Sequence, residues 1–110
     1  MQKLNGQFFQ MPNIVFAHHL TPDQFTVYCY LVCRAGSKDK CWPSVKTIGG
    51  ECGLSENTVR KAIKTLVERG FISKVATKRY GRNGRCYQGN NHYYIQEMPN
   101  LARSAPVTPL

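Results

Sequence analysis

The residues with the clearest chemistry lie between positions 55 and 64. Asn57 carries an amide that suits the edge of an adenine, Arg60 a guanidinium that suits guanine, and Lys64 an ammonium group that suits phosphate. The spacing places these side chains on one side of a helix. The sequence therefore predicts a nucleic-acid recognition helix over residues 55–69. Its candidate contact residues are Ser55, Glu56, Asn57, Thr58, Arg60, Lys61 and Lys64.

A second group of cations follows in residues 78–91. The chain has 15 Lys and Arg against 6 Asp and Glu, which gives a formal net charge of +9. Residues 57–85 hold nine basic residues and one acidic residue, so this segment alone carries 9 − 1 = +8. A charge kept only for solubility would mix both signs, so a segment of one sign favours a polyanionic partner. The candidate contacts in this second group are Lys78, Arg79, Arg82, Asn83 and Arg85.

Cysteine and histidine side chains offer weaker grounds for a site. The five cysteines are an odd number, and they include no C-x2-C pair of the kind that binds zinc. Most of them fall on or near predicted buried faces, where cysteine behaves as a small apolar residue. No nucleophile or carboxylate pair accompanies His18, His19 or His92. We therefore expect no catalytic residue, no metal and no cofactor.

A well-marked helix begins near residue 21. Thr21 suits the N-cap, Pro22 the first helical position, and Gln24 completes a capping box. Gly36 predicts the end of this helix. Residues 1–20, which precede this helix, are expected to form an arm that packs on the core and contains one short helical turn. The predicted core face of the helix is Phe25, Tyr28, Cys29, Val32 and Ala35, with Leu31 beside it.

Two further helices are predicted to meet at a sharp turn. The first covers residues 44–52, and Ser55 caps the second. Gly53 suits the positive φ that the turn needs. Gly49, one helical turn earlier, allows the two helices to cross closely, whereas Gly50 has no evident role and lowers helix stability. The buried face of the second helix is expected at Val59, Ala62, Ile63, Leu66 and Val67.

After the recognition helix the apolar pattern changes from helical to alternating. Residues 71–80 and 92–97 are predicted as the strands of a β-hairpin with a long basic tip, and residues 81–84 and 89–91 as turns. Aromatic residues in such a hairpin usually join the core or form cross-strand pairs. Tyr87 is the best candidate for the alternative, which is stacking on single-stranded bases. The tyrosines concerned are Tyr80, Tyr87, Tyr93 and Tyr94.

The chain resembles the winged-helix domains of plasmid and phage replication proteins, and it is also similar to GntR-type transcription regulators. The pattern that carries the resemblance is Cys41-Trp42-Pro43-Ser44 followed by Leu54-Ser55-x-x-Thr58-Val59-Arg60-Lys61-Ala62-x-x-x-Leu66-x-x-x-Gly70-Phe71-Ile72. The resemblance implies an α+β winged helix-turn-helix fold over about residues 8–97. It also implies that the recognition helix enters the major groove of duplex DNA while the wing touches the backbone or the minor groove.

The organisation that follows is an arm over 1–20, a winged helix-turn-helix domain over 21–97 and a Pro-rich flexible tail or linker over 98–110. We expect specific binding of duplex DNA, in transcription regulation or in the replication of a mobile element, in the cytoplasm and on the nucleoid when bound. A protein-interaction module, and RNA or single-strand binding through the wing, stay open as alternatives. A homodimer formed through the apolar arm also stays open. No membrane span and no small-molecule effector site is evident.

Overall fold

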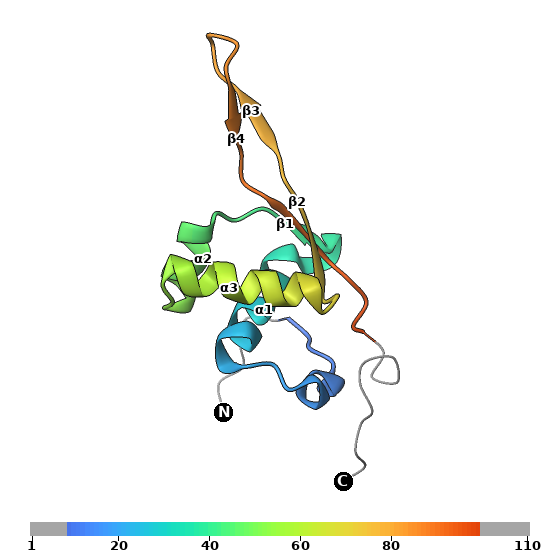
Figure 1. Cartoon of the computed structure of the whole chain (residues 1–110). Helices are drawn as coiled ribbons and strands as arrows, with labels where there is room; N and C mark the ends of the chain where they lie inside the picture. The colour runs from blue at the N-terminus through green and yellow to red at the C-terminus, as the bar shows by residue number, and fades with distance from the viewer. Residues whose placement is uncertain (1–8, 100–110) are drawn as a thin grey trace, which may run out of the picture.

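The computed structural model describes residues 9–99, so residues 1–8 of the predicted arm and 100–110 of the predicted tail lie outside the described residues. The helices form the body of the molecule, and a ribbon of strands rises from it (Figure 1). No helix of residues 9–99 combines the length and the apolar character that crossing a membrane requires. In chain order the elements are η1 (Asn13–His18), α1 (Pro22–Ala35), η2 (Gly36–Lys38), β1 (Lys40–Cys41), α2 (Val45–Cys52), α3 (Glu56–Glu68), β2 (Ile72–Val75), β3 (Lys78–Tyr80), β4 (Cys86–Gln88) and β5 (His92–Ile95).

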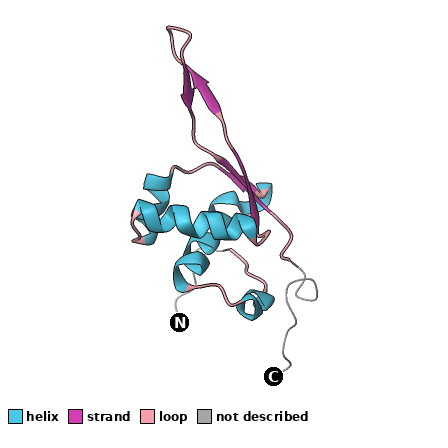
Figure 2. Ribbon diagram, viewed as in Figure 1, coloured by secondary structure: helices cyan, strands magenta, loops and turns pink. Residues whose placement is uncertain are grey.

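A three-stranded antiparallel sheet joins the ribbon to the helices. Its strand order is β1–β5–β2, with Cys41 opposite Tyr93 and Ile72 opposite Ile95. β3 and β4 pair only with each other and continue the hairpin away from the body (Figure 2). Three helices, a small sheet and a projecting hairpin make an α+β winged helix, which confirms the predicted fold class.

Both predicted ends of α1 are confirmed. The Thr21 hydroxyl accepts a hydrogen bond from the Gln24 N–H (3.3 Å), and the Gln24 side-chain oxygen accepts one from the Thr21 N–H (3.1 Å). This capping box satisfies donors that the first turn would otherwise leave unpaired. The helix ends at Gly36, whose φ of +57° is disfavoured for residues with a side chain.

The buried face of α1 differs from the predicted one. Val27 is fully buried, although the predicted core face of this helix does not include it. Tyr28, Leu31 and Ala35 are buried as expected. α1 contacts α3 and also β1 and β5, so its buried stripe is turned toward the space between them. The residues of the predicted face that are only half-buried are Phe25, Cys29 and Val32.

The turn between α2 and α3 brings two stretches of backbone into close contact. Gly53 adopts φ 71° and ψ 32°, the left-handed conformation predicted for it. The Leu54 N–H donates to the Gly49 carbonyl (2.9 Å), and a Cβ on Gly49 would lie 2.6 Å from the Leu54 carbonyl oxygen and 3.7 Å from a methyl carbon of Val59. The expected need for a small residue at Gly49 is therefore confirmed. A Cβ on Gly50 would meet nothing within 4 Å, and nothing in the structure explains that glycine.

α3 begins and ends where the sequence predicts. Ser55 is its N-cap and Arg69 its C-cap. Its apolar stripe packs on α1 and α2. The predicted core residues Val59, Ala62, Ile63 and Leu66 are buried, and Val67 is half-buried.

The tip of the hairpin is shorter than predicted. Residues 86–88, which the prediction left in the tip, form β4. The turn is confined to residues 81–85, where the Gly81 N–H donates to the Arg85 carbonyl (2.9 Å) and Gly84 has φ +76°. These local bonds reverse the chain early enough for the residues after the turn to pair with β3.

The strands are interrupted at residues 89–91, where the sequence predicts a turn. β2 pairs with β5 and β3 with β4, so residues 76–77 face the longer segment 89–91. An extra residue on one strand is a β-bulge, which bends a ribbon and increases its twist. The Thr77 hydroxyl donates to the Asn90 carbonyl, and the Asn90 amide donates to the Trp42 carbonyl (3.2 Å). The predicted continuous strand over 71–80 is therefore two strands, β2 and β3.

The short helical turn predicted in the arm is confirmed as η1, and its last residue is buried. The His18 ring packs edge-on against Phe71, with ring centroids 5.0 Å apart, and its Nε2 atom has no hydrogen-bond partner within residues 9–99. Arg69 donates to the His18 backbone carbonyl (2.6 Å) and lies over the Phe71 ring. Burial, and then the charge of Arg69, lower the pKa of His18 below its ordinary value.

We expect Gly49→Ala to lower the free energy of unfolding by about 2 kcal/mol, because the new methyl group would overlap the Leu54 carbonyl and overpacking costs ~1–3 kcal/mol. Gly50→Ala is the matched control on the same helix. It has open space around it and should raise the stability by up to ~1 kcal/mol, since alanine is the better helix former. Urea denaturation of both variants measures the difference, and equal effects would contradict the close approach at Gly49.

The protein should also lose stability as the pH falls through the range below 6.5. A histidine whose pKa is lower in the folded state binds fewer protons there than in the unfolded chain. Its contribution is therefore complete above the unfolded pKa and is lost as the pH falls toward the folded pKa. Urea denaturation at pH 7.5 and at pH 5.5 measures the loss, which should be smaller in His18→Gln. An identical loss in that variant would assign the effect to other groups.

Candidate nucleic-acid interface

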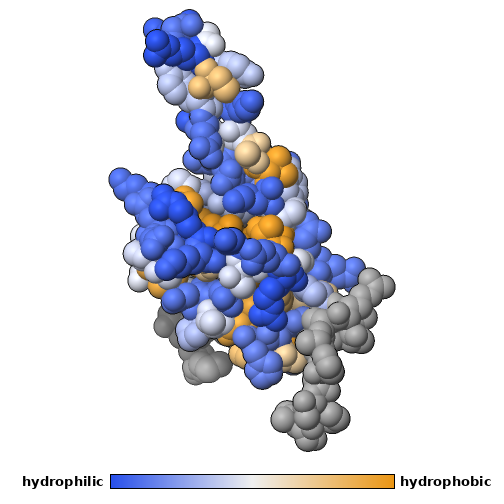
Figure 3. All heavy atoms as spheres, in the orientation of Figure 1, coloured by the Kyte–Doolittle hydropathy of each residue, from blue (hydrophilic) through white to orange (hydrophobic). Residues whose placement is uncertain are grey.

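One face of α3 points to solvent, and it carries the predicted contact residues. The exception is Thr58, which is half-buried and supports the N-cap. Its N–H donates to the Ser55 Oγ (3.1 Å), and the Ser55 hydroxyl donates to the Thr58 Oγ1 (2.8 Å). The exposed residues are Ser55, Glu56, Asn57, Arg60, Lys61 and Lys64. Hydrophilic side chains cover much of this side of the body and the tip of the ribbon (Figure 3).

The charge of this face is mostly uncompensated. Glu56 and Arg60 form an exposed ion pair (3.4 Å), which is the one salt bridge among residues 9–99. An exposed pair at this helical spacing contributes only ~0.3–0.5 kcal/mol, so Arg60 can exchange Glu56 for another anion at little cost. Lys61 and Lys64 have no such partner within the described residues.

An open cleft of about 670 Å³ joins the face of α3 to the base of the hairpin. Arg60 and Lys64 line it from α3, and Lys74 lines it from β2. These cations surround a hollow that also presents amide and hydroxyl groups. The other lining residues are Pro43, Ser44, Val45, Ile63, Gln88, Gly89, Asn90, Asn91 and Tyr93.

Lys74 was absent from the predicted contact residues, although it belongs to the basic segment. It pairs across the sheet with Tyr93 and shares a face with Ile72, both of which are buried. Alternation along β2 therefore directs Lys74 toward the helices rather than away from them. Its exposed position on the cleft shows that the helical layer ends there. The period-two pattern of residues 72–74 indicates the face of β2 on which Lys74 lies, but it does not indicate that this position is exposed.

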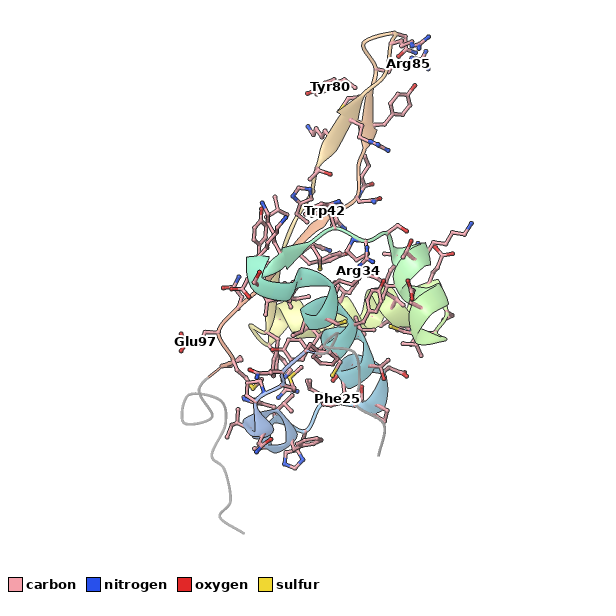
Figure 4. The ribbon with its side chains drawn as sticks, turned by 180° about the vertical axis from the view of Figure 1, so that it is seen from behind. Phe25, Arg34, Trp42, Tyr80, Arg85 and Glu97 are labelled. Atoms are coloured by element: carbon pink, nitrogen blue, oxygen red, sulfur yellow. The ribbon has the colours of Figure 1, made fainter. Side chains whose placement is uncertain are left out.

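The ribbon of β3 and β4 carries the second group of cations. Every residue of both strands is exposed, and the strands pair Lys78 with Gln88 and Arg79 with Tyr87. Arg85 lies at the far tip (Figure 4). The Asn83 side-chain oxygen accepts a hydrogen bond from the Arg85 N–H (3.1 Å), so that amide shapes the turn. The structure therefore places these predicted residues on the projecting ribbon, away from the α3 face.

The four tyrosines of the hairpin do not share one environment. Tyr93 is buried (1% exposed) and belongs to the core, which confirms the expectation for it. Tyr94 is half-buried. Tyr80 and Tyr87 are 75% and 51% exposed, so neither belongs to the core, although Tyr80 lies opposite Cys86 and Tyr87 opposite Arg79 on the paired strand. The reason is that both lie beyond the sheet, on strands that no helix covers.

The thiols show no arrangement suited to a metal ion. Burial raises the pKa of the Cys29, Cys41 and Cys52 thiols, which favours the protonated form over the thiolate that binds metals. The Cys41 thiol lies 3.6 Å from the Leu31 carbonyl oxygen, to which it donates. Residues 9–99 contain no group of three or more His, Cys, Asp or Glu side chains that could hold a metal.

Comparison with known proteins agrees with this geometry. The family model described as a helix-turn-helix domain matches residues 18–72, from the end of η1 to the start of β2. The chain belongs to this helix-turn-helix family. The family match contains α1, α2 and α3, whereas β3 and β4 lie outside it. No functionally curated protein matches the sequence.

A solved structure is similar to most of the chain. It is a possible transcriptional regulator from Methanosarcina mazei Go1, with a TM-score of 0.52 and 15% sequence identity. The similarity covers 84% of this chain and 77% of that chain. At this identity the comparison shows the shared fold alone.

Removing the cap of α3 should destabilise the domain. We expect Ser55→Ala to lower the free energy of unfolding by ~1 kcal/mol, because the Thr58 N–H would lose its acceptor. Ser55→Asp should restore most of the loss, since a carboxylate accepts the same hydrogen bond and suits a helix N-terminus. Urea denaturation measures both, and a Ser55→Ala variant as stable as the parent would contradict the role of the cap.

Proposed function

We propose that this helix-turn-helix protein binds duplex DNA in a sequence-specific manner and serves transcription regulation. The observation that carries the proposal is the cleft in which Arg60 and Lys64 of α3 meet Lys74 at the base of the hairpin. A convex helix with a basic edge would fit a groove, and a cation-lined hollow beside it would receive the adjacent phosphate backbone.

The dimensions and side chains of α3 suit the major groove. Its residues 56–68 span roughly 20 Å at ~1.5 Å each, and the groove is ~12 Å wide and admits a helix. Asn57 and Arg60 offer the two-point hydrogen bonding that distinguishes adenine and guanine. Lys61 and Lys64 offer charge to phosphates, and the N–H groups of the first helical turn add a further anion-binding element.

The ribbon would contribute affinity more than base readout. The ribbon has no acidic residue, and its cations are Lys78, Arg79, Arg82 and Arg85. Cations of this kind bind the DNA backbone or enter a narrow minor groove. Contacts of this kind are made to DNA of every sequence, so they strengthen binding to all sites together.

The same surface would serve the replication of a mobile element. The segment Cys41–Ser44, through which the sequence resembles replication proteins, runs from the last residue of β1 to the N-cap of α2. Ser44 caps α2 by accepting from the Thr47 N–H (3.0 Å) and also lines the cleft. DNA binding is therefore common to both roles.

A selection of bound DNA from a random pool, followed by two variants, tests the proposal. We expect Arg60→Ala to weaken binding to the selected site by about 10- to 100-fold and to affect random DNA much less. Arg82→Ala should weaken binding to both and flatten the salt dependence by about one charge. A two-fold symmetric selected site would indicate that two chains bind together.

Arg34→Ala is the matched control, because it removes the same charge from an exposed position on α1 that does not line the cleft. It should leave affinity for the selected site nearly unchanged. Failure to select any DNA, with no salt-dependent binding, would reject the proposal and favour a protein-interaction module. Equal losses on selected and random DNA would remove Arg60 as a base-reading residue.

A further inference from the structure

Two tyrosines of the ribbon project into solvent from opposite faces. Tyr80 is paired with Cys86 and Tyr87 with Arg79, and neighbouring residues of a strand point to opposite sides. Their exposed fractions are 75% and 51%. Tyr80 stands out to one side of the ribbon (Figure 4). Single exposed aromatic residues are ordinary on a protein surface, but these two lie on a narrow ribbon that contributes no residue to the core.

The ring of Tyr87 is held in position by a glycine of the turn. A Cβ on Gly81 would lie 2.8 Å from Cε2 of Tyr87, so the ring lies against bare backbone. The turn beneath it is closed by the hydrogen bond from the Gly81 N–H to the Arg85 carbonyl (2.9 Å). Tyr87 is therefore supported on one side and open on the other, as a stacking platform must be.

The charges around the two rings select a polyanion as the partner. Arg82 and Arg85 lie in the turn, and Lys78 and Arg79 lie on β3. The sequence has no acidic residue between Glu68 and Glu97. An aromatic platform within a groove or arm of cations is the arrangement by which proteins bind unpaired nucleotides, with bases on the rings and phosphates on the cations.

An intact duplex offers these rings little to contact. Its bases are stacked, so its grooves expose base edges and phosphates rather than base faces. Base faces become available where the strands are unpaired.

From these contacts we propose that the ribbon binds unpaired nucleotides of DNA beside the duplex site of α3, with Tyr80 and Tyr87 stacking on bases. This inference rests on the proposed function, because α3 supplies the duplex contact that places the ribbon. The protein would then distinguish a locally opened site from the same site fully paired. Such a preference would couple DNA binding to processes that separate the strands.

The test compares two DNA molecules that share the selected α3 site. One is fully paired, and the other has about four unpaired nucleotides beside the site, with 2-aminopurine among them. The parent protein should bind the opened DNA about tenfold more tightly and quench the 2-aminopurine fluorescence. Tyr80→Leu/Tyr87→Leu should bind both molecules equally, at the parent's affinity for paired DNA. Tyr80→Phe/Tyr87→Phe should keep the preference, because phenylalanine retains the stacking face.

Gly81→Ala provides an independent variant, since its methyl group would displace the Tyr87 ring while both tyrosines remain. It should reduce the preference for opened DNA about as much as Tyr87→Leu alone. The tyrosine variants should keep the parent's thermal unfolding midpoint, because β3 and β4 are exposed along their whole length.

Several outcomes separate this inference from the proposed function. Equal binding of paired and opened DNA by the parent protein overturns the inference and leaves duplex binding intact. Loss of the preference in the phenylalanine variant would also overturn it, since hydroxyl contacts would then replace stacking. Tighter binding of an RNA strand of the unpaired sequence would assign the ribbon to RNA. Absence of binding to both DNA molecules would instead reject the proposed function.

Discussion

The contact between Gly49 and the Leu54 carbonyl sets the geometry on which the rest of the interface depends. α2 and the turn after it can approach to this distance only where a side chain is absent, and Gly53 supplies the positive φ that reverses the chain at once. The turn aims the apolar stripe of α3 at α1 and α2. Because a helix has two sides, burying that stripe leaves the cations of α3 facing outward.

The second requirement is that the hairpin stand beside α3. β5 pairs with β1 on one edge and β2 on the other, and buried Tyr93 and Ile72 fasten this sheet to the helices. Phe71 adds to the same attachment, since it is buried between Tyr28 and His18. Lys74 then reaches the cleft because β2 leaves the helical layer immediately after its buried residue.

The bulge at the base of the hairpin divides two functions of one chain segment. Below it, β2 and β5 attach the hairpin to the core through the buried side chains of Ile72 and Tyr93. Above it, β3 and β4 have no covering layer, so their side chains are available to a partner. Two hydrogen bonds, from Thr77 to Asn90 and from Asn90 to Trp42, tie this junction to the loop before α2. The hairpin therefore changes at Thr77 from strands that attach to the core to strands whose side chains are exposed.

Much of the fold and most of the α3 face could be predicted from the sequence, because the signals are local. Caps at Thr21, Ser44 and Ser55, and glycines at 36 and 53, act within one helical turn of themselves. The apolar spacing of α3 defines its buried stripe, and the opposite side follows from helix geometry alone.

Other features could be known only from the tertiary structure. They are the positions whose burial or exposure depends on where one element stops covering another. Alternation predicts which side of a strand faces the helices, but it does not predict that the helical layer ends at Lys74. The bulge opposite residues 76–77 depends on cross-strand register, which links residues distant in the sequence. Tyr93 and Tyr87 are the same residue type on the same hairpin, yet one is buried and the other exposed. The physical reason is that burial is set by neighbours from other segments, whereas caps, turns and helical periodicity are set by neighbours along the chain.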